Sequence, residues 1–181
     1  MISACSYETP VGALTVLATG IDEATGDDSA VATIVAAGFC PAADLWDRLP
    51  TDDGSELQTV DHLGALHEPI ERYLDGDLEA LDQVAVAQKG TDLQQQVWEG
   101  LRQIPAGETR TYSELAETTS KPKAVRAVGS ACGRNLIAPF VPCHRALRSD
   151  GTLGGYYYGL DVKRWLLAHE SQSDQLSLEL Q

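Results

Sequence analysis

The feature that most constrains this sequence is a change in its hydrophobic pattern near Lys89-Gly90. Before this point, short apolar and β-branched runs are separated by turns rich in glycine and aspartate. After it, apolar residues recur every three to four positions. We therefore predict an α+β protein with an N-terminal α/β domain and small β-sheet over residues 1–88, and a mainly helical C-terminal domain over 89–171. Residues 172–181 are expected to form a flexible tail.

The first domain begins with a predicted β-hairpin over residues 1–18, which turns at Thr9-Pro10-Val11-Gly12. The pattern then predicts, in order, a loop over 20–30, a buried strand over 31–39, a polar loop over 41–54 and an amphipathic helix over 62–75. None of these segments contains a motif that indicates chemistry.

The second domain is predicted to be built from short helices. Apolar residues over 97–104 lie on one helix face, and a capping box starts the next helix at Thr111. Ser120 is expected to cap a third helix, which ends at Gly133. Two short helices around a tight turn make a helix-turn-helix. A final helix is predicted over residues 160–170.

The second helix of this pair carries small residues where a DNA-recognition helix usually has long polar side chains. Ala127 and Gly129 would allow close approach to a shallow groove, with Arg126 as the long cation beside them. Small residues also suit a packing interface inside the domain, and the pattern leaves that interpretation open for Gly129. A buried, unpaired arginine is costly, so Arg126 favours the groove.

The charge is distributed very unevenly. The net charge of −14 argues at first against a nucleic-acid partner. However, residues 1–91 hold 17 acidic and 3 basic side chains, whereas residues 92–171 hold 8 acidic and 10 basic ones. Any contact with DNA is therefore predicted for the second domain. No apolar run reaches the roughly 20 residues of a membrane span, and no secretory signal is visible, so we expect a cytoplasmic protein without a membrane partner.

The chain has four cysteines and no CxxC pair. Three of them, Cys5, Cys40 and Cys132, are interpreted as small buried hydrophobic residues. A zinc site built from Cys5, Cys40, His62 and His67 is disfavoured because the spacing matches no zinc template, so no metal is expected.

The fourth cysteine lies in the run Pro142-Cys143-His144-Arg145. A thiol becomes a nucleophile when a neighbouring imidazole takes its proton, and a carboxylate can orient that imidazole. His144 and Glu170, at the end of the last predicted helix, are candidates for these roles. Adjacent residues on a strand point to opposite faces, so Cys143 and His144 need a turn or a bridging water to cooperate.

Several further segments stand in register with this run: TYSELA at 111–116, PKAVRAVGSACGRN at 122–135, GYYYG at 155–159 and KRWLLAHE at 163–170. Over about residues 91–170 the sequence thus resembles the methylated-DNA–protein-cysteine methyltransferases, also called O6-alkylguanine-DNA alkyltransferases. The resemblance implies a ribonuclease-H-like first domain and a winged helix-turn-helix in the second. It also implies a monomer without cofactor that acts on double-stranded DNA containing O6-alkylguanine.

The resemblance implies irreversible, stoichiometric transfer of an alkyl group, mainly methyl, to Cys143, with O4-alkylthymine as a further candidate substrate. His144 would be the base that acts through a water, and Glu170 would orient it. Asn135 would tie the helix-turn-helix to the active-site turn.

For DNA, the resemblance implies that Arg126 fills the gap left by a flipped base, while Tyr112 pushes on the target phosphate and meets guanine N3. Tyr156 and Lys163 would close the pocket and polarise the leaving guanine, and the backbone near Val141 would read the base edge. This agrees with guanine O6 lying inside the base stack, from which the base must be extruded.

The residues leave plainer interpretations open for three of these positions. Lys163 could face solvent, Glu170 could be an exposed helix end, and Tyr112 could be a packed aromatic. The sequence also departs from the family pattern. Leu136 stands where proline is common, Leu93 where an aromatic is common, and Tyr157-Tyr158 adds bulk that predicts a tight pocket.

Three other functions fit part of the pattern. An alkylation-sensing regulator would need an effector or dimerisation module, and the first domain shows no signature of one. A lesion-recognition protein that does not react would lack the acceptor, yet Cys143 is present. A cysteine hydrolase would turn over many times rather than stop at one equivalent.

The acidic first domain generates a prediction about salt. Either the host has high internal salt, which screens the repulsion within about 3–10 Å, or this is an ordinary acidic protein. On the first interpretation the free energy of unfolding rises steeply into molar salt, as measured by denaturant titration at several salt concentrations. A free energy that does not change with molar salt would contradict adaptation to high salt.

Overall fold

The computed structural model describes residues 1–21, 31–50 and 54–178, with side chains up to Ser171. It divides into two compact units: residues 1–88 with 136–140, and residues 89–135 with 141 onward. The mixed α+β class is confirmed, whereas the ribonuclease-H-like description of the first domain stays a prediction. Among the described residues, no helix is both long and apolar enough to cross a membrane.

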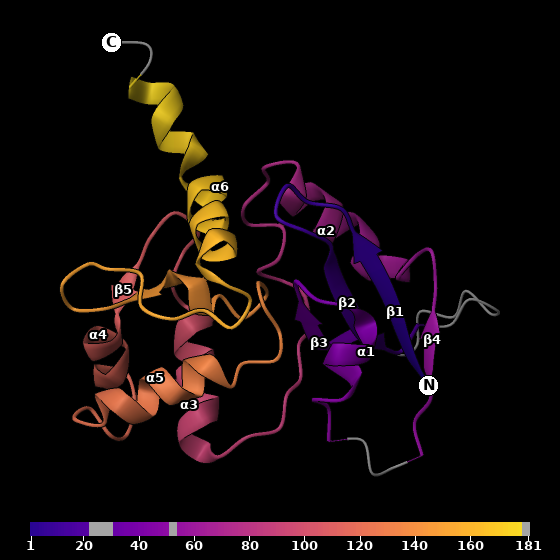
Figure 1. Ribbon diagram of the computed structural model, residues 1–181, viewed down its shortest axis with the longest axis horizontal. Helices are drawn as coiled ribbons and strands as arrows, with labels where there is room; N and C mark the ends of the chain where they lie inside the picture. Colours follow the sequence, from indigo (N-terminus) through magenta and orange to yellow (C-terminus); the bar gives the residue numbers. More distant parts are fainter. Residues whose placement is uncertain (22–30, 51–53, 179–181) are drawn as a thin grey trace. The chain divides into compact units, whose positions relative to one another are not determined.

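A four-stranded sheet forms the first unit, in the order β3-β2-β1-β4 (Figure 1). Strands β1 (Ile2–Tyr7) and β2 (Leu14–Thr19) form the predicted antiparallel hairpin, and Gly12 supplies the positive φ of +112° that its turn requires. Strand β3 (Thr33–Gly38) pairs with β2 and confirms the buried strand. Strand β4 (Leu57–Thr59), parallel to β1, is too short for the sequence pattern to have revealed.

The segment 136–140 belongs to the first unit, which corrects its assignment to the second domain. Strand β3 lies at the edge of the sheet, where Ile34 already exchanges hydrogen bonds with Ala85 and Ala87 but Ala37 needs another partner. The amide of Ala37 donates to Leu136 O at 2.8 Å, and the amide of Ala138 donates to Ala37 O at 3.1 Å. These two bonds anchor the segment on the β3 edge, a pairing between distant residues that local pattern does not reveal.

Three helical segments accompany the sheet: α1 (Ala42–Trp46), the 3-10 turn η1 (Gly64–Leu66) and α2 (His67–Leu74). The helix predicted over 62–75 is thus confirmed, with its first turn tightened. The loop predicted over 41–54 is wrong where α1 forms. Leu45 is fully buried in the core cluster with Leu17, so packing stabilises a helix that its polar neighbours concealed. Most of the loop predicted over 20–30 lies outside the described residues.

The second unit contains α3 (Asp92–Arg102), α4 (Tyr112–Glu117), α5 (Val125–Gly133) and α6 (Leu160–Leu178), which Figure 1 labels. Between α5 and α6 lie the 3-10 turn η2 (Cys143–Arg145) and β6 (Ala146–Leu147), which pairs with β5 (Arg110–Thr111). Helices α4 and α5 are the predicted pair. Helix α6 begins as expected but extends into the segment predicted to be a tail.

The ends of these helices test the capping predictions. The box at Thr111 is confirmed: its Oγ1 accepts from the amide of Glu114 at 3.1 Å, and Glu114 Oε2 accepts from the amide of Thr111 at 2.7 Å. Thr91 makes a similar box for α3, which the sequence reasoning missed. Ser120 is not a cap, because α5 begins at Val125 after a turn and has no side-chain cap.

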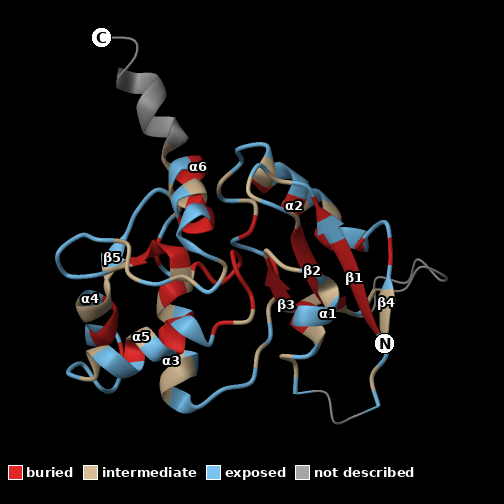
Figure 2. Cartoon of the chain, viewed as in Figure 1, coloured by how far each residue is buried: buried red, intermediate tan, exposed pale blue. Residues whose placement is uncertain are grey.

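A buried hydrogen bond joins helices α3 and α5. Trp98 is 4% exposed, and its indole Nε1 donates to Ala131 O at 2.9 Å. Ala131, one of the small residues of α5, is 2% exposed and so faces the interior. Figure 2 shows that α5 carries both buried and exposed residues. Ala127 is exposed and Gly129 half-buried, so the same helix presents small residues to both the core and the surface.

Candidate active site and nucleic-acid interface

The run Pro142-Cys143-His144-Arg145 forms a tight turn rather than a strand. The amide of Cys143 donates to Val141 O at 2.8 Å, and the amide of Arg145 donates to Pro142 O at 3.0 Å. The turn gives the two adjacent side chains different surroundings. Cys143 is half-buried and lines a cavity, while His144 is fully buried. The turn that we expected for cooperation between these residues is present.

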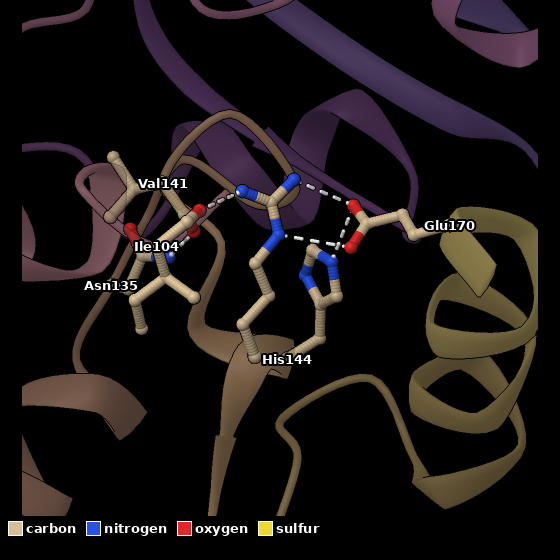
Figure 3. A network of polar contacts seen from close by, with 6 residues as sticks. Ile104, Asn135, Val141, His144 and Glu170 are labelled. Carbon is tan, nitrogen blue, oxygen red and sulfur yellow. Dashed lines mark hydrogen bonds and ion pairs between the residues drawn. The ribbon is translucent and has the colours of Figure 1, made fainter. Parts of the chain in front are cut away.

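Behind the turn lies a buried polar network, shown in Figure 3. His144 Nε2 lies 2.8 Å from Glu170 Oε1. Arg145 donates to both oxygens of the same carboxylate, from Nε at 2.9 Å and from NH2 at 2.8 Å, and its NH1 donates to Ile104 O. Glu170 is 1% exposed, so the interpretation of this residue as an exposed helix end is wrong. The sequence reasoning did not assign Arg145 a role, although it lies within the motif.

The charges of this network are set by burial and by its own contacts. Burial alone would raise the pKa of Glu170, but His144 and Arg145 hold that pKa well below its ordinary value of 4.5. Complete burial lowers the pKa of His144, an effect that the Glu170 carboxylate opposes. A buried carboxylate is tolerated here because a guanidinium binds both of its oxygens.

The imidazole is arranged to accept a proton. In neutral His144, the Nε2–H donates to Glu170, which leaves Nδ1 with its lone pair. Nδ1 is buried and has no hydrogen-bond partner among the described residues. The site thus has a carboxylate that fixes the tautomer and a free basic nitrogen on the residue next to Cys143.

Asn135 connects the end of α5 with the active-site turn. It is 3% exposed, and its Nδ2 donates to Val141 O at 2.7 Å (Figure 3). Leu136 follows it where the family commonly has proline. The Leu136 amide donates to Gln88 Oε1 at 3.0 Å within the first unit, a hydrogen bond that proline could not make.

The cavity beside Cys143 has a volume of about 370 Å³ and belongs entirely to the second unit. Five residues to which we had given a role in catalysis or DNA binding line it: Tyr112, Gly129, Asn135, Cys143 and Tyr156. Its other lining residues are Cys132, Gly133, Arg148, Gly154, Gly155, Tyr157 and Tyr158. A space of this size suits a small aromatic ligand such as a nucleobase.

Arg126, Ala127 and Lys163 are predicted site residues that do not line the cavity. Arg126 and Ala127 occupy the exposed side of α5, as a groove-facing surface requires. Lys163 is fully buried, so the interpretation of this residue as facing solvent is wrong. Its ammonium donates to Ala146 O at 2.7 Å and to Leu153 O, and burial lowers its pKa.

Tyr112 lies at the start of α4 and on the cavity wall. Burial, followed by the nearby Cys132 and Cys143 thiols, raises the pKa of its hydroxyl to about 12, so the hydroxyl keeps its proton at neutral pH. Gly154 packs against it so closely that a Cβ there would lie 3.2 Å from the hydroxyl oxygen. The absence of a side chain at Gly154 therefore leaves room for Tyr112.

Comparison with known proteins accords with this geometry. The sequence model of the 6-O-methylguanine DNA methyltransferase DNA-binding domain matches residues 92–172. A methylated-DNA–protein-cysteine methyltransferase of Methanosarcina mazei is 44% identical over 126 residues, which cover 70% of this chain and 77% of that protein. This chain belongs to the methylated-DNA–protein-cysteine methyltransferase family.

Further relatives differ in how much of their length is matched. A family member from Methanosarcina barkeri is 51% identical over 58% of this chain and 65% of its own length. The bifunctional transcriptional activator and DNA repair enzyme Ada of Escherichia coli is 53% identical over 48% of this chain and 25% of its own length. The chain therefore spans just under two thirds of the M. barkeri protein and a quarter of Ada.

The fold extends the similarity over both units. The crystal structure of Mycobacterium tuberculosis OGT in complex with DNA is 31% identical, with a TM-score of 0.72, and the match covers 93% of this chain and 92% of that one. The family resemblance seen in the sequence is thus confirmed beyond the C-terminal half.

Replacing Glu170 with glutamine tests the buried network. The change leaves Arg145 as an uncompensated buried charge, and we expect a loss of roughly 3–5 kcal/mol of stability at neutral pH. Because the pKa of Glu170 is depressed in the folded protein, its stabilisation is complete above about pH 4.5 and declines as the pH falls below that value. The difference in the free energy of unfolding between the unaltered protein and Glu170→Gln should therefore become smaller in acid.

Denaturant titrations of both proteins between pH 7 and pH 3 measure this difference in the free energy of unfolding. Glu117→Gln, a change at an exposed glutamate of α4, is the matched control and should behave like the unaltered protein. If the difference in the free energy of unfolding stayed constant from pH 7 to pH 3, a depressed pKa at Glu170 would be contradicted.

Proposed function

We propose that this protein repairs double-stranded DNA by taking the alkyl group of O6-alkylguanine onto the sulfur of Cys143, once per molecule. The observation that carries the proposal is the position of Cys143 on the cavity wall, directly before a fully buried His144 that is hydrogen-bonded to Glu170. This arrangement is that of a nucleophile, a base and an orienting carboxylate. Membership in the methyltransferase family supports the same reaction.

The transfer balances without a cofactor. The Cys143 proton passes through a water to His144 Nδ1, and Glu170 stabilises the imidazolium that forms. The thiolate attacks the sp³ carbon attached to guanine O6. A C–S bond forms, the C–O bond breaks, and its electron pair stays on the guanine oxygen. The product is a thioether, which simple hydrolysis does not reverse, so the protein is consumed.

Lys163 acts on both the attacking Cys143 sulfur and the leaving guanine oxygen in this proposal. Its ammonium is held by two backbone carbonyls, and it interacts electrostatically with Cys143. A fixed positive charge near the sulfur favours the thiolate over the thiol. The same charge, together with Tyr156 on the cavity wall, would polarise the guanine as negative charge develops on its oxygen.

Access to guanine O6 requires the base to leave the duplex. We propose that α5 approaches the minor groove with its exposed Arg126 and Ala127, and that Arg126 fills the space of the extruded base. Tyr112 would press on the target phosphate and meet guanine N3, while the backbone near Val141 reads the base edge. The DNA complex of the similar M. tuberculosis protein supports this use of the fold.

The reaction uses residues of one chain, so we propose a monomer that acts in the cytoplasm. Ada is named a transcriptional activator as well as a repair enzyme, which keeps an alkylation-sensing regulator as the second candidate. The match covers a quarter of Ada. Specific binding to an operator sequence in a gel-shift assay would favour the regulator.

Stoichiometric methyl transfer tests the proposal directly. After incubation with a duplex that contains O6-methylguanine, the unaltered protein should gain the mass of one methylene, on the Cys143 peptide, and then stop. Cys143→Ala should gain nothing, because the acceptor is missing, whereas Cys40→Ala, a matched change in the first unit, should react normally. Intact-mass and peptide spectrometry measure both results. An unmodified Cys143 in the unaltered protein would refute the proposal.

The lining of the cavity also leads to a prediction about the size of the alkyl group that the protein accepts. Tyr156, Tyr157 and Tyr158 line the cavity. The ring centroids of Tyr157 and Tyr158 lie 5.0 Å apart, and those of Tyr156 and Tyr158 lie 5.8 Å apart. This aromatic wall should admit a methyl group more readily than a benzyl group. We expect free O6-benzylguanine to inactivate the protein slowly, and Tyr158→Gly to be inactivated faster. The residual methyl-transfer activity after timed exposure measures both, and rapid inactivation of the unaltered protein would contradict a tight pocket.

A further inference from the structure

Arg148 is a cavity residue to which the proposed chemistry gives no role. It is exposed, yet it lines the same cavity as Cys143 and Tyr112. The exposed Arg110 and Arg164 form ion pairs with nearby acids, at 2.8 and 3.0 Å. By contrast, the guanidinium of Arg148 forms no hydrogen bond or ion pair with any residue whose side chain is described.

A tight turn fixes where this side chain begins. The amide of Arg148 donates to Thr152 O at 3.0 Å, and the amide of Gly151 donates to Arg148 O at 2.9 Å. The first carbons of the side chain lie beside Gly154, since a Cβ on that glycine would be 3.5 Å from Arg148 Cγ. The same Cβ would be 3.2 Å from the Tyr112 hydroxyl, so Arg148 and Tyr112 flank one glycine on the cavity wall.

Asp150, two positions along the chain, forms no ion pair with this arginine, although hydrogen bonds from Thr152 and, to a smaller extent, the Arg148 charge lower the pKa of its carboxyl group. Asp150 Oδ1 accepts from the amide of Thr152 at 2.9 Å and from its hydroxyl at 2.7 Å, so this oxygen is engaged within the turn. On the other side, Arg148 and the buried Lys163 repel each other, which further lowers the pKa of Lys163. Two cations therefore lie at the cavity, Arg148 in its wall and Lys163 buried nearby, and neither forms an ion pair with a described side chain, in a chain whose net charge is −14.

An anion at the cavity mouth would remove this repulsion. When a base is extruded, it rotates about its backbone, so the base enters the pocket while its phosphates stay outside. A guanidinium binds phosphate through paired hydrogen bonds and remains charged at every physiological pH. We propose that Arg148 binds a backbone phosphate next to the extruded nucleotide and so holds the damaged strand at the mouth of the cavity.

This inference rests on the proposed function, and its test separates the two. The proteins compared are the unaltered chain, Arg148→Gln and Arg148→Lys, with Arg164→Gln as the matched control at an exposed arginine outside the cavity lining. The first measurement is binding to a duplex containing O6-methylguanine over a range of salt. Loss of one phosphate contact should reduce the slope of log affinity against log salt by about 0.9 in Arg148→Gln. Arg148→Lys and Arg164→Gln should keep the slope of the unaltered protein.

The second measurement is the rate of methyl transfer from two substrates. Transfer from the duplex should fall roughly tenfold in Arg148→Gln, because a charge-assisted hydrogen bond is lost. Transfer from the free nucleoside O6-methyl-2′-deoxyguanosine, which has no phosphate, should be unchanged. An equal fall with both substrates would overturn the inference, since Arg148 would then act on the thiolate or the base. An unchanged salt slope in Arg148→Gln would overturn it as well.

The proposed function fails on a different result. If the unaltered protein transfers no methyl group from either substrate, direct repair is refuted. The salt slopes of the four proteins still decide whether Arg148 contacts a phosphate.

Discussion

The buried carboxylate of Glu170 is the group on which the active site depends. It receives two hydrogen bonds from Arg145 and one from His144, and all three residues are almost inaccessible to water. A carboxylate so deep in the protein stays charged only while these donors surround it. Because it stays charged, it fixes the imidazole tautomer and leaves Nδ1 as the basic nitrogen. The network also connects α6 to the 3-10 turn, so the groups of the proposed reaction are held by the same contacts that stabilise the unit.

The rest of the site is arranged in front of this network. Asn135 joins the end of α5 to the turn through Val141, and Lys163 reaches the carbonyl groups of Ala146 and Leu153 from α6. The cavity wall is formed by residues from α4, α5, the turn and the segment before α6. Small residues on α5 serve two purposes, since Ala131 accepts a hydrogen bond from Trp98 while Ala127 stays at the surface. The surface that faces DNA in our proposal is therefore backed by the packing of α5 against α3.

Sequence reasoning succeeded where the signal was local. The hairpin at Gly12, the capping box at Thr111 and the end of α5 at Gly133 each follow from a few neighbouring residues. It failed where distant residues decide. Helix α1 forms because Leu45 packs into the core, and residues 136–140 join the first unit because the β3 edge needs partners. Arg145 was overlooked for the same reason: nothing in its neighbourhood shows that Glu170, 25 positions away, is its partner.

By itself, the sequence determined the order of most elements, the change of pattern near Lys89, the concentration of basic residues in the second half and the family to which the chain belongs. It also singled out Cys143 as the candidate acceptor, because the run that contains it stands in register with several other segments of the family. Only the tertiary structure decided that His144, Glu170 and Lys163 are buried, which groups hold them and that Arg148 reaches the cavity. Burial and charge pairing arise when segments far apart in the chain come together. No local pattern records the pKa of a carboxylate or the partner of an arginine.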